Sequence, residues 1–341
     1  HNIPPGGYDM YQTGGRLYGK LRLDKKGLVA TGKVEYLSSS SESEAYTFFL
    51  DSVTAKGKNY VIEPGTIGGA SFPGISSSSF RMNWKTREDK MFIYNVDEPF
   101  DLYNSTASLE GATILGKSGV NGEGTFKARG FEAKSKEFTF EETEMTARHS
   151  NFVVASENPE KPLMQGNDIR LDFDLTANIG QLSPEVEGAA ALEFPYSQMK
   201  TSISKATWNL ADQKVKMENP ENVDIKSSYF YSTRKELDSL AFNASGAEYD
   251  LKTSELLVTG IPYIKVADAL ITPEDNKVLV LENSTIGTLK NTNIVIDTLY
   301  EYHNLFDGTI DIVSRKKFTG DATYQLVNAV KDTFAIKFRK F

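Results

Sequence analysis

The sequence predicts an all-β protein made of consecutive antiparallel hairpin units, arranged as a β-sandwich, a jellyroll or a solenoid. Apolar and polar residues alternate with a period of two along most segments, which is typical of half-buried strands. Proline and glycine interrupt these segments at roughly ten-residue spacing, as turns between short strands do. The 20 phenylalanines and 16 tyrosines also favour strands over helices.

The first hairpin is predicted near the beginning of the chain. In residues 17–23 the odd positions are apolar or glycine, and the even positions are mostly polar. Residues 24–27 form a turn in which Gly27 supplies a positive φ, and residues 28–37 form the returning strand.

An internal repeat is the strongest feature of the sequence. Residues 17–62 align with residues 109–154 at a constant offset of 92 without a gap, and 13 of the 46 aligned positions are identical. This alignment predicts a duplicated unit of 92 residues. The identical positions in the first copy are Leu17, Gly19, Leu23, Lys25, Gly27, Gly32, Ser43, Thr47, Phe48, Thr54, Ala55, Asn59 and Val61.

A second block extends the predicted unit. Phe72 and Pro73 precede Trp84, and Phe194 and Pro195 precede Trp208, the only other tryptophan. We therefore expect the two tryptophans to occupy equivalent environments. The stretches between the blocks, 63–71 and 155–193, differ in length as a surface insertion would.

The tail from about residue 240 lacks this pattern and is expected to form a different β unit. Strands are predicted at 247–251, 255–260, 264–266 and 277–281, with a turn at 272–276, and a short helix at 233–241. The predicted domains are 1–104, the first repeat unit, 105–240, the second unit with a longer insertion, and 241–341, the tail unit.

Composition excludes several classes of protein. The 38 basic residues against 46 acidic ones give a formal charge of −8, which argues against nucleic-acid binding. The absence of cysteine excludes disulfides, cysteine–zinc sites and thiol nucleophiles, and it fits an exported protein. The longest apolar stretches are too short to cross a bilayer, so we expect no transmembrane segment.

A phosphate-binding loop is one interpretation of Gly119, Gly122 and Gly124. Such a loop needs a helix after it, whereas residues 125–128 continue as a strand. Two of these glycines also match Gly27 and Gly32 of the first copy. A turn is therefore the favoured interpretation.

Metal and cofactor sites are not expected. His1, His149 and His303 are isolated from one another in the sequence, without a ligand spacing such as HxxxH. Asp172 and Asp174 alternate with apolar residues and should share one face of a strand, which is usually a solvated face. Calcium binding at this acidic pair is the less favoured alternative.

Catalysis is also not expected, because the chain lacks a GxSxG nucleophile motif and has few histidines to serve as bases. A carboxylate pair needs only acidic residues and stays open. The acids are not shared between the copies, however, since Asp51 aligns with Thr143 and Asp24 with Gly116.

Trp84 and Trp208 have two interpretations. Their recurrence after a Phe-Pro pair favours core packing, and the alternative is a pair of exposed platforms for sugar stacking. Basic residues near the C-terminus, 315–317 and 337–340, either contact an anionic head group or protect an exposed edge strand with charge.

The tail resembles the OstA-like domains of periplasmic lipopolysaccharide-transport bridges. Residues 247–260 (AEYDLKTSELLVTG) and 264–271 (IKVADALI) carry the resemblance, and the Gly-x-Leu-x-Gly-x-Leu-x-Leu pattern within 14–37 is similar to strands of larger periplasm-spanning proteins. The chain also resembles long repeat-containing surface or periplasmic proteins of Bacteroidetes-type bacteria. These resemblances imply a groove or jellyroll of stacked hairpins that binds acyl chains. The 92-residue unit is longer than an OstA-like repeat, which puts a continuous lipid groove in doubt.

Together these observations predict a non-catalytic scaffold or bridge of the bacterial cell envelope, exported to the periplasm or cell surface. Its expected partners are other envelope proteins or a lipid or other amphiphile, with no nucleic acid and no cofactor. The first alternative is a surface module that binds a glycan or a protein, and the second is a carboxylate-pair hydrolase.

Overall fold

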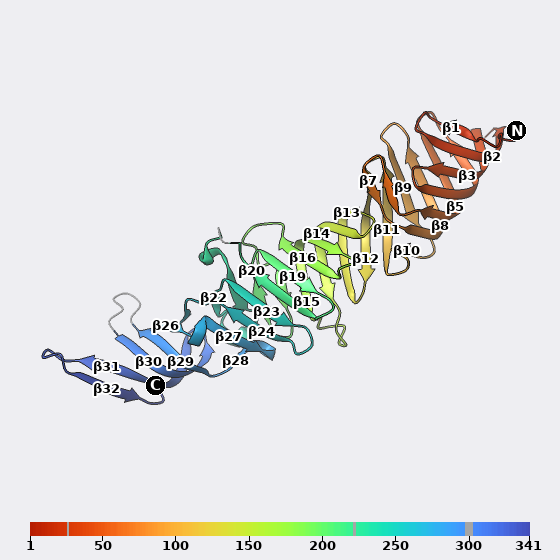
Figure 1. The fold of residues 1–341 in the computed structure, drawn as a ribbon. Coiled ribbons are helices and arrows are strands. Elements are labelled where there is room, and N and C mark those ends of the chain that lie inside the picture. Colours follow the sequence, from red (N-terminus) through yellow and green to blue (C-terminus); the bar gives the residue numbers. More distant parts are fainter. Residues whose placement is uncertain (26, 221–222, 297–302) are drawn as a thin grey trace. The chain divides into compact units, whose positions relative to one another are not determined.

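The computed structural model describes residues 1–25, 27–220, 223–296 and 303–341, and it confirms the all-β prediction (Figure 1). Consecutive antiparallel strands account for most of these residues. The helical part of the described chain consists of short 3₁₀ turns: η1 (Ile225–Ser227), η2 (Lys235–Leu237), η3 (Glu274–Asn276) and η4 (Glu282–Ser284).

The chain divides into two compact units. Unit 1 contains residues 1–152 and 170–177, and unit 2 contains residues 153–169 and 178–341. The predicted three-part division at 104 and 240 stays a prediction.

Unit 1 is a meander of antiparallel strands. Strands β2 to β5 pair in chain order, and β5 pairs with β8. The long strand β8 then pairs with β9 near its C-terminal end and with β10 near its N-terminal end, and both of these short strands pair with β11. The strands are β1 (Tyr8–Met10), β2 (Gly15–Asp24), β3 (Gly27–Tyr36), β4 (Ser39–Phe48), β5 (Ser52–Ile62), β6 (Gly65–Ile67), β7 (Ala70–Phe72), β8 (Ile75–Lys85), β9 (Lys90–Asn95), β10 (Phe100–Leu102), β11 (Ala107–Gly116), β12 (Gly119–Ala128), β13 (Phe131–Phe140), and most of β14 (Glu144–Val154) and part of β15 (Met164–Asp174).

The strand bounds in unit 1 repeat at the predicted offset. Strands β2, β3, β4 and β5 begin and end 92 residues before β11, β12, β13 and β14. The β3–β4 pair has a bulge between Ala30 and Gly32, and the β12–β13 pair has one between Gly122 and Gly124, again 92 residues later. That a duplication event produced this repetition stays a prediction.

Each of the two hairpins has a pair of facing glycines at which its strands approach closely. Gly19 lies opposite Gly32, and Gly111 lies opposite Gly124, all with φ between +121° and +151°. A Cβ on Gly19 would lie 2.2 Å from a neighbouring backbone oxygen, and one on Gly111 would lie 2.1 Å from another. Only glycine fits such a close approach with this backbone conformation.

Aromatic side chains fill the core of unit 1. Tyr60 packs on Phe80 and Phe100 with ring centroids 5.8 and 6.5 Å away, and Phe131 packs on Phe173 at 5.0 Å. All five are buried, and alternation along each strand directs them to the interior. Burial of each large side chain contributes about 1.5–3 kcal/mol to stability.

Unit 2 contains the remaining strands in three pairing series. One series runs β16–β19–β20–β23–β24–β27–β28, a second β17–β18–β21–β22, and a third β25–β26–β29–β30–β31–β32. The bounds are β16 (Ile179–Pro184), β17 (Leu192–Phe194), β18 (Met199–Thr201), β19 (Lys205–Asn209), β20 (Lys214–Glu218), β21 (Tyr229–Ser232), β22 (Ala241–Asn243), β23 (Gly246–Asp250), β24 (Glu255–Thr259), β25 (Ile264–Val266), β26 (Ala269–Thr272), β27 (Lys277–Leu281), β28 (Thr285–Ile286), β29 (Leu289–Ile296), β30 (His303–Ser314), β31 (Lys317–Val327) and β32 (Thr333–Phe338).

The strands predicted in the tail are confirmed as β23, β24, β25 and β27. The helix predicted at 233–241 is wrong, because this stretch holds only the turn η2 and the first residue of β22. Leu237 and Leu240 are buried there without a helix.

Candidate functional site

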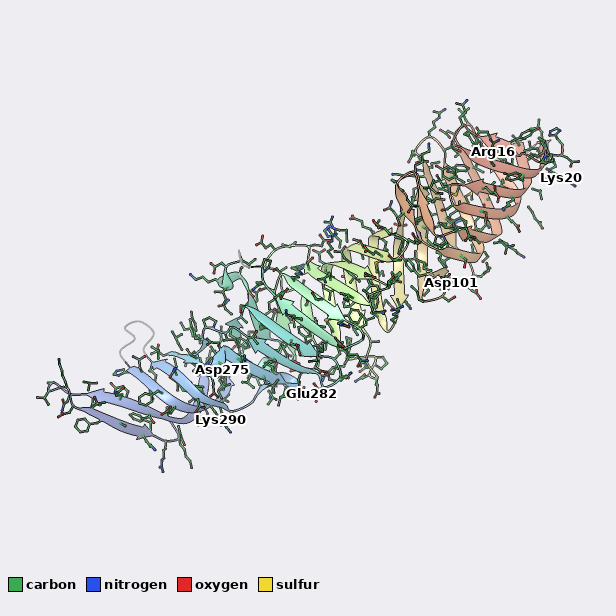
Figure 2. The ribbon with its side chains drawn as sticks, in the orientation of Figure 1. Arg16, Lys20, Asp101, Asp275, Glu282 and Lys290 are labelled. Carbon is green, nitrogen blue, oxygen red and sulfur yellow. The ribbon has the colours of Figure 1, made fainter. Side chains whose placement is uncertain are left out.

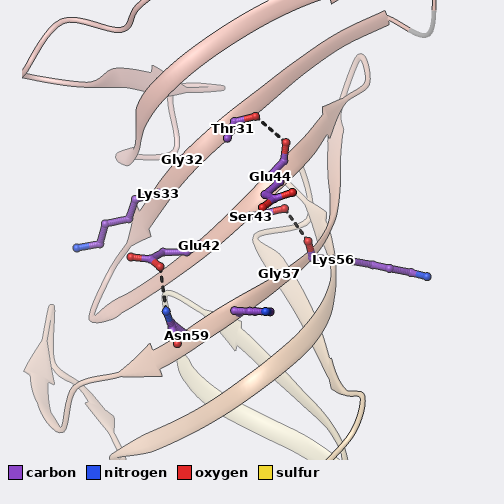
Figure 3. A pocket seen from close by; sticks show the side chains of 10 residues that line it. Thr31, Gly32, Lys33, Glu42, Ser43, Glu44, Lys56, Gly57 and Asn59 are labelled. Carbon is purple, nitrogen blue, oxygen red and sulfur yellow. Dashed lines mark hydrogen bonds between the residues drawn. The ribbon is translucent and has the colours of Figure 1, made fainter.

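Two grooves lie at repeat-equivalent positions on unit 1. Groove A has a volume of about 700 Å³ and lies over β3, β4 and β5 (Figure 3). Groove B has a volume of about 690 Å³ and lies over β8, β9, β11, β12, β13 and β14. Groove A is lined by Thr31, Gly32, Lys33, Glu42, Ser43, Glu44, Lys56, Gly57, Lys58 and Asn59, and groove B by Arg81, Tyr94, Asn95, Gly111, Ala112, Glu123, Gly124, Lys134, Ser135, Lys136, Glu137, His149 and Asn151.

Equivalent serines form the same pair of hydrogen bonds in both grooves. In groove A, Ser43 Oγ donates to the carbonyl oxygen of Lys56 at 2.6 Å and accepts from Ala45 N at 3.0 Å. In groove B, Ser135 donates to the carbonyl oxygen of Arg148 and accepts from Glu137 N at 2.9 Å. These bonds satisfy backbone groups that the irregular pairing beside them leaves without a ladder partner.

Charges of both signs line groove A. Asn59 Nδ2 donates to Glu42 Oε2 at 2.9 Å (Figure 3). Lys33 Nζ lies 2.7 Å from Glu35 Oε1, and this contact lowers the pKa of Glu35 and raises the pKa of Lys33. Both side chains of that pair are well exposed, so water screens the interaction. Groove A therefore presents hydrogen-bonding groups of both kinds to a ligand.

Groove B adds an aromatic wall. The guanidinium of Arg81 lies 4.9 Å from the ring centroid of Tyr94, and Asn95 Oδ1 accepts from Gly111 N at 2.8 Å. An aromatic ring beside amide and charged groups is a combination that suits a ligand rich in hydroxyl groups.

An apolar hollow lies at the end of unit 1 that carries the N-terminus. Its volume is about 590 Å³. Figure 2 labels Arg16 and Lys20, two exposed cationic residues of β2 at this end. The hollow is lined by Tyr8, Asp9, Met10, Tyr11, Leu17, Leu21, Leu28, Phe48, Phe49 and Leu50.

The two tryptophans are buried but not equivalent, so that expectation is wrong. Trp84 lies on β8 opposite Val53 of β5, whereas Trp208 lies on β19 opposite Gly180 of β16. Both are almost fully buried, at 0% and 3% exposed, which agrees with core packing and not with exposed sugar platforms.

Phe173 holds the place that corresponds to Trp84. Thr86 N donates to Asp51 O at 3.1 Å, and Leu175 N donates to Thr143 O, 92 residues after Asp51, at 3.0 Å. Phe173 precedes Leu175 as Trp84 precedes Thr86. The Phe-Pro…Trp pattern therefore matched β8 with β19, although these two strands have different neighbours.

The acidic pair of β15 is occupied by internal contacts. Asp172 accepts from Arg170 at 2.8 Å and from Thr146 Oγ1 at 2.8 Å. Asp174 accepts from two backbone N–H groups in the following turn, each at 2.8 Å. Among the residues that the structure describes, no group of three or more His, Cys, Asp or Glu side chains is placed to hold a metal ion.

The glycine cluster of β12 lies in a strand, so the turn interpretation holds only at its first member. Gly119 follows the β11–β12 turn, whereas Gly122 and Gly124 lie within β12 and flank its bulge. The histidines are dispersed: His1 contacts Tyr8 OH at 2.7 Å, His149 lines groove B, and His303 lies on β30.

The C-terminal basic residues separate into two groups. Arg315 and Lys316 lie 3.4 and 2.9 Å from Asp238, and they lower the pKa of that carboxyl group. Lys337 lies on β32, which is exposed along its whole length and follows β31 at the end of its series. The second group thus fits the edge-strand interpretation.

Sequence analysis missed both grooves and the hollow. The grooves depend on which residues of several separate strands come into register, and no local pattern reveals that. The hollow had a visible signal, since Phe49 and Leu50 of the first copy align with Glu141 and Glu142 of the second.

Comparison with known proteins gives no relative: no protein-family model, curated protein or solved structure matches the chain. Within the described ranges, no helix is both long and apolar enough to cross a membrane.

Proposed function

We propose that this chain is a non-catalytic scaffold or bridge of the bacterial cell envelope. The observation that supports this most is the meander of unit 1, in which β2 to β5 pair in chain order and β5 pairs with β8 around a core of buried aromatic rings. A meander of this kind can be extended by adding hairpins, each of which packs against its neighbours. An extendable array of this kind is suited to a spacer.

The grooves support a non-catalytic role. Glu42 is held by Asn59 at 2.9 Å, and lysines line the same wall. Open grooves with mixed charges leave substrate exposed to water, whereas catalytic sites exclude water and hold their groups in fixed geometry.

An enzyme assay and cell fractionation test the scaffold. We expect the purified chain to leave p-nitrophenyl esters and glycosides unchanged, and we expect it in the envelope fraction of the cells that produce it. Turnover that Glu42→Gln or Glu137→Gln abolishes, while Lys58→Gln leaves it intact, would establish the carboxylate-pair hydrolase instead.

Amphiphile binding is a second candidate, and the apolar hollow favours it. Leucine and phenylalanine side chains line this space, and several of them are partly exposed. Mass spectrometry of an organic extract of the purified protein should then detect acyl chains, and Leu28→Asp should remove them. An extract free of acyl chains rejects this candidate.

Glycan binding is favoured only at groove B, by the Tyr94 ring beside Asn95 and Asn151. A glycan array with the full chain should then give signals that Tyr94→Ala abolishes. Groove A carries no aromatic residue and supplies the matched control through Lys58→Ala.

A further inference from the structure

A β-bulge lies in each groove. In groove A, Thr31 of β3 stands at the bulge opposite Glu44 of β4, and in groove B, Glu123 of β12 stands opposite Lys136 of β13. The two positions correspond at the offset of 92. A bulge leaves one residue out of the hydrogen-bonding ladder, so the backbone groups of that residue need other partners.

Groove A satisfies its bulge internally. Thr31 Oγ1 donates to the carbonyl oxygen of Glu44 at 2.6 Å (Figure 3). Both residues line the groove. The backbone acceptor at this place in groove A is therefore already occupied by a side chain of the protein.

Groove B lacks this internal hydrogen bond. Glu123 stands at the place of Thr31, and an ionised carboxylate accepts hydrogen bonds but donates none. The carbonyl oxygen of Lys136 therefore loses the side-chain donor that its counterpart has in groove A. Glu123 is exposed and adds its own oxygen atoms at the same bulge, so groove B offers hydrogen-bond acceptors to a ligand there.

An aromatic side chain stands across the groove from these acceptors. Tyr94 of β9 pairs with Ala112 of β11, and Ala112 pairs with Glu123. Directly opposed residues of neighbouring strands project from the same face of a sheet, so Tyr94 and Glu123 flank the small side chain of Ala112. Two strand spacings separate the backbones of β9 and β12 by about 10 Å, a span that one sugar residue with its hydroxyl groups can bridge.

The charges of groove B favour an uncharged ligand at the bulge. Arg81 lies on β8, beyond Tyr94, with its guanidinium 4.9 Å from the centroid of that ring. On the other side of Glu123, β13 contributes two lysines and one glutamate, Lys134, Lys136 and Glu137. Glu123 would repel an anionic group, and the net positive charge on both sides of it would repel a cationic one. An uncharged group that donates hydrogen bonds fits best.

We propose that groove B binds a sugar residue of a neutral glycan through two adjacent hydroxyl groups. One hydroxyl group donates to the carboxylate of Glu123 and the other to the carbonyl oxygen of Lys136, while the apolar face of the sugar ring packs against Tyr94. Groove A does not bind this ligand, because Thr31 occupies the equivalent acceptor and no aromatic residue lines that groove. The inference rests on the glycan-binding candidate above and names its ligand class.

A reciprocal exchange between the two copies tests the contact. Glu123→Thr gives groove B the donor of groove A, and it should weaken glycan binding at least tenfold. Thr31→Glu makes the opposite change in groove A, serves as the matched control, and should leave binding unchanged. Both positions are exposed, so urea titrations should show that both variants fold.

Glycan arrays test the ligand class. One array carries neutral hexose, uronate and amino-sugar oligosaccharides, and a second carries the same oligosaccharides after periodate oxidation and borohydride reduction. Periodate cleaves the bond between carbons that bear adjacent hydroxyl groups. We expect signals from neutral oligosaccharides on the first array and signals at least tenfold weaker from their oxidised forms. Isothermal titration calorimetry with the strongest array ligand then compares the unaltered chain with Glu123→Thr and Thr31→Glu.

Three results overturn the proposal: equal affinity of Glu123→Thr and the unaltered chain, signals confined to uronate or amino-sugar oligosaccharides, and binding that survives periodate oxidation. If Tyr94→Ala still abolishes the array signals in these cases, glycan binding at groove B stands and only the contact with adjacent hydroxyl groups is wrong. An array without any signal overturns both the contact and the glycan-binding candidate. None of these results alters the turnover and fractionation results that test the scaffold.

Discussion

The β2–β3 and β11–β12 hairpins of unit 1 have strands of the same length and the same pair of facing glycines, yet they differ at their outer edges. Strand β9 covers β11 and buries Leu115, whereas Leu23 of β2 is exposed. The local pattern thus sets strand and register, and the neighbouring strand sets burial.

The copies also differ after the gapless region. Strand β8 follows β5 after a connection that includes β6 and β7, and β15 follows β14 after a different connection. Trp84 on β8 therefore corresponds to Phe173 on β15, although the sequence patterns had matched it with Trp208. A comparison of core positions tests this correspondence.

The largest expected effect is at Trp84. Trp84→Ala should lower the free energy of unfolding by about 3–5 kcal/mol, because it empties a fully buried aromatic site. Trp84→Phe should cost clearly less, since phenylalanine fills the corresponding place at Phe173. Urea titrations followed by circular dichroism measure both changes.

Trp208→Ala in unit 2 should cost a similar amount, about 3–5 kcal/mol, without a change in glycan binding. A Trp84→Phe variant as unstable as Trp84→Ala would break the correspondence with Phe173. A stable Trp208→Ala variant that loses glycan binding would restore the sugar-platform interpretation.

The leucine pair sharpens the comparison at the outer edge. Leu115→Ala should cost about 2–5 kcal/mol because it leaves a cavity at a fully buried site. Leu23→Ala should change stability by less than about 0.5 kcal/mol, as exposed substitutions do. Equal costs in urea unfolding would mean that Leu23 is already covered in the free protein.

The facing glycines should behave alike in both copies. Gly19→Ala and Gly111→Ala each force a Cβ to within about 2 Å of a backbone oxygen at a positive φ. We expect each to cost about 2–4 kcal/mol through strain and overpacking. Gly14→Ala, where a Cβ meets nothing within 4 Å but φ is also positive, separates the steric cost from the conformational one. A Gly111→Ala variant no less stable than Gly14→Ala would contradict the close approach of the strands at the facing glycines.

The sequence supported prediction of the hairpins because their signals are local. Period-two alternation at residues 17–23 and the turn glycine Gly27 specify a strand and its turn without reference to distant residues. The offset of 92 residues between equivalent strands could be predicted for the same reason, since each copy has its own glycines at equivalent positions.

Features that depend on distant strands could not be predicted this way. The helix expected at 233–241 failed because burial of Leu237 and Leu240 against other strands outweighed weak helix propensity. Trp84 and Trp208 share a sequence context, but strand pairing decides their neighbours. The exposed Phe49 was visible in the alignment, where it stands against Glu141 of the second copy.

The smallest expected effect concerns two equivalent tyrosines, Tyr11 and Tyr103. Tyr103 OH donates to Glu144 O at 2.9 Å, and Tyr11 OH donates to Phe49 O at 2.6 Å. Tyr103→Phe should cost about 0.5–1.5 kcal/mol, because it removes a part-buried hydrogen bond, while Glu144 O keeps the bond from Glu141 N. Tyr11→Phe should cost less, since its bond to Phe49 O is exposed to water.

The pH dependence of the two variants distinguishes the environments further. Burial, with the nearby carboxylates of Glu141 and Glu144, raises the pKa of Tyr103 above its ordinary value of 10.0. The unfolded chain then loses the tyrosine proton first, so this residue's stabilisation is complete below pH 10 and declines as the pH rises above 10. The stability advantage of the unaltered chain over Tyr103→Phe should therefore shrink between pH 8 and pH 11 in urea titrations. Burial also raises the pKa of Tyr11, which is less buried and has one nearby carboxylate, Asp51, so its advantage should shrink less. Parallel pH profiles for Tyr103→Phe and the unaltered chain would show that Tyr103 is already in contact with water, and the two copies would then be alike at this turn.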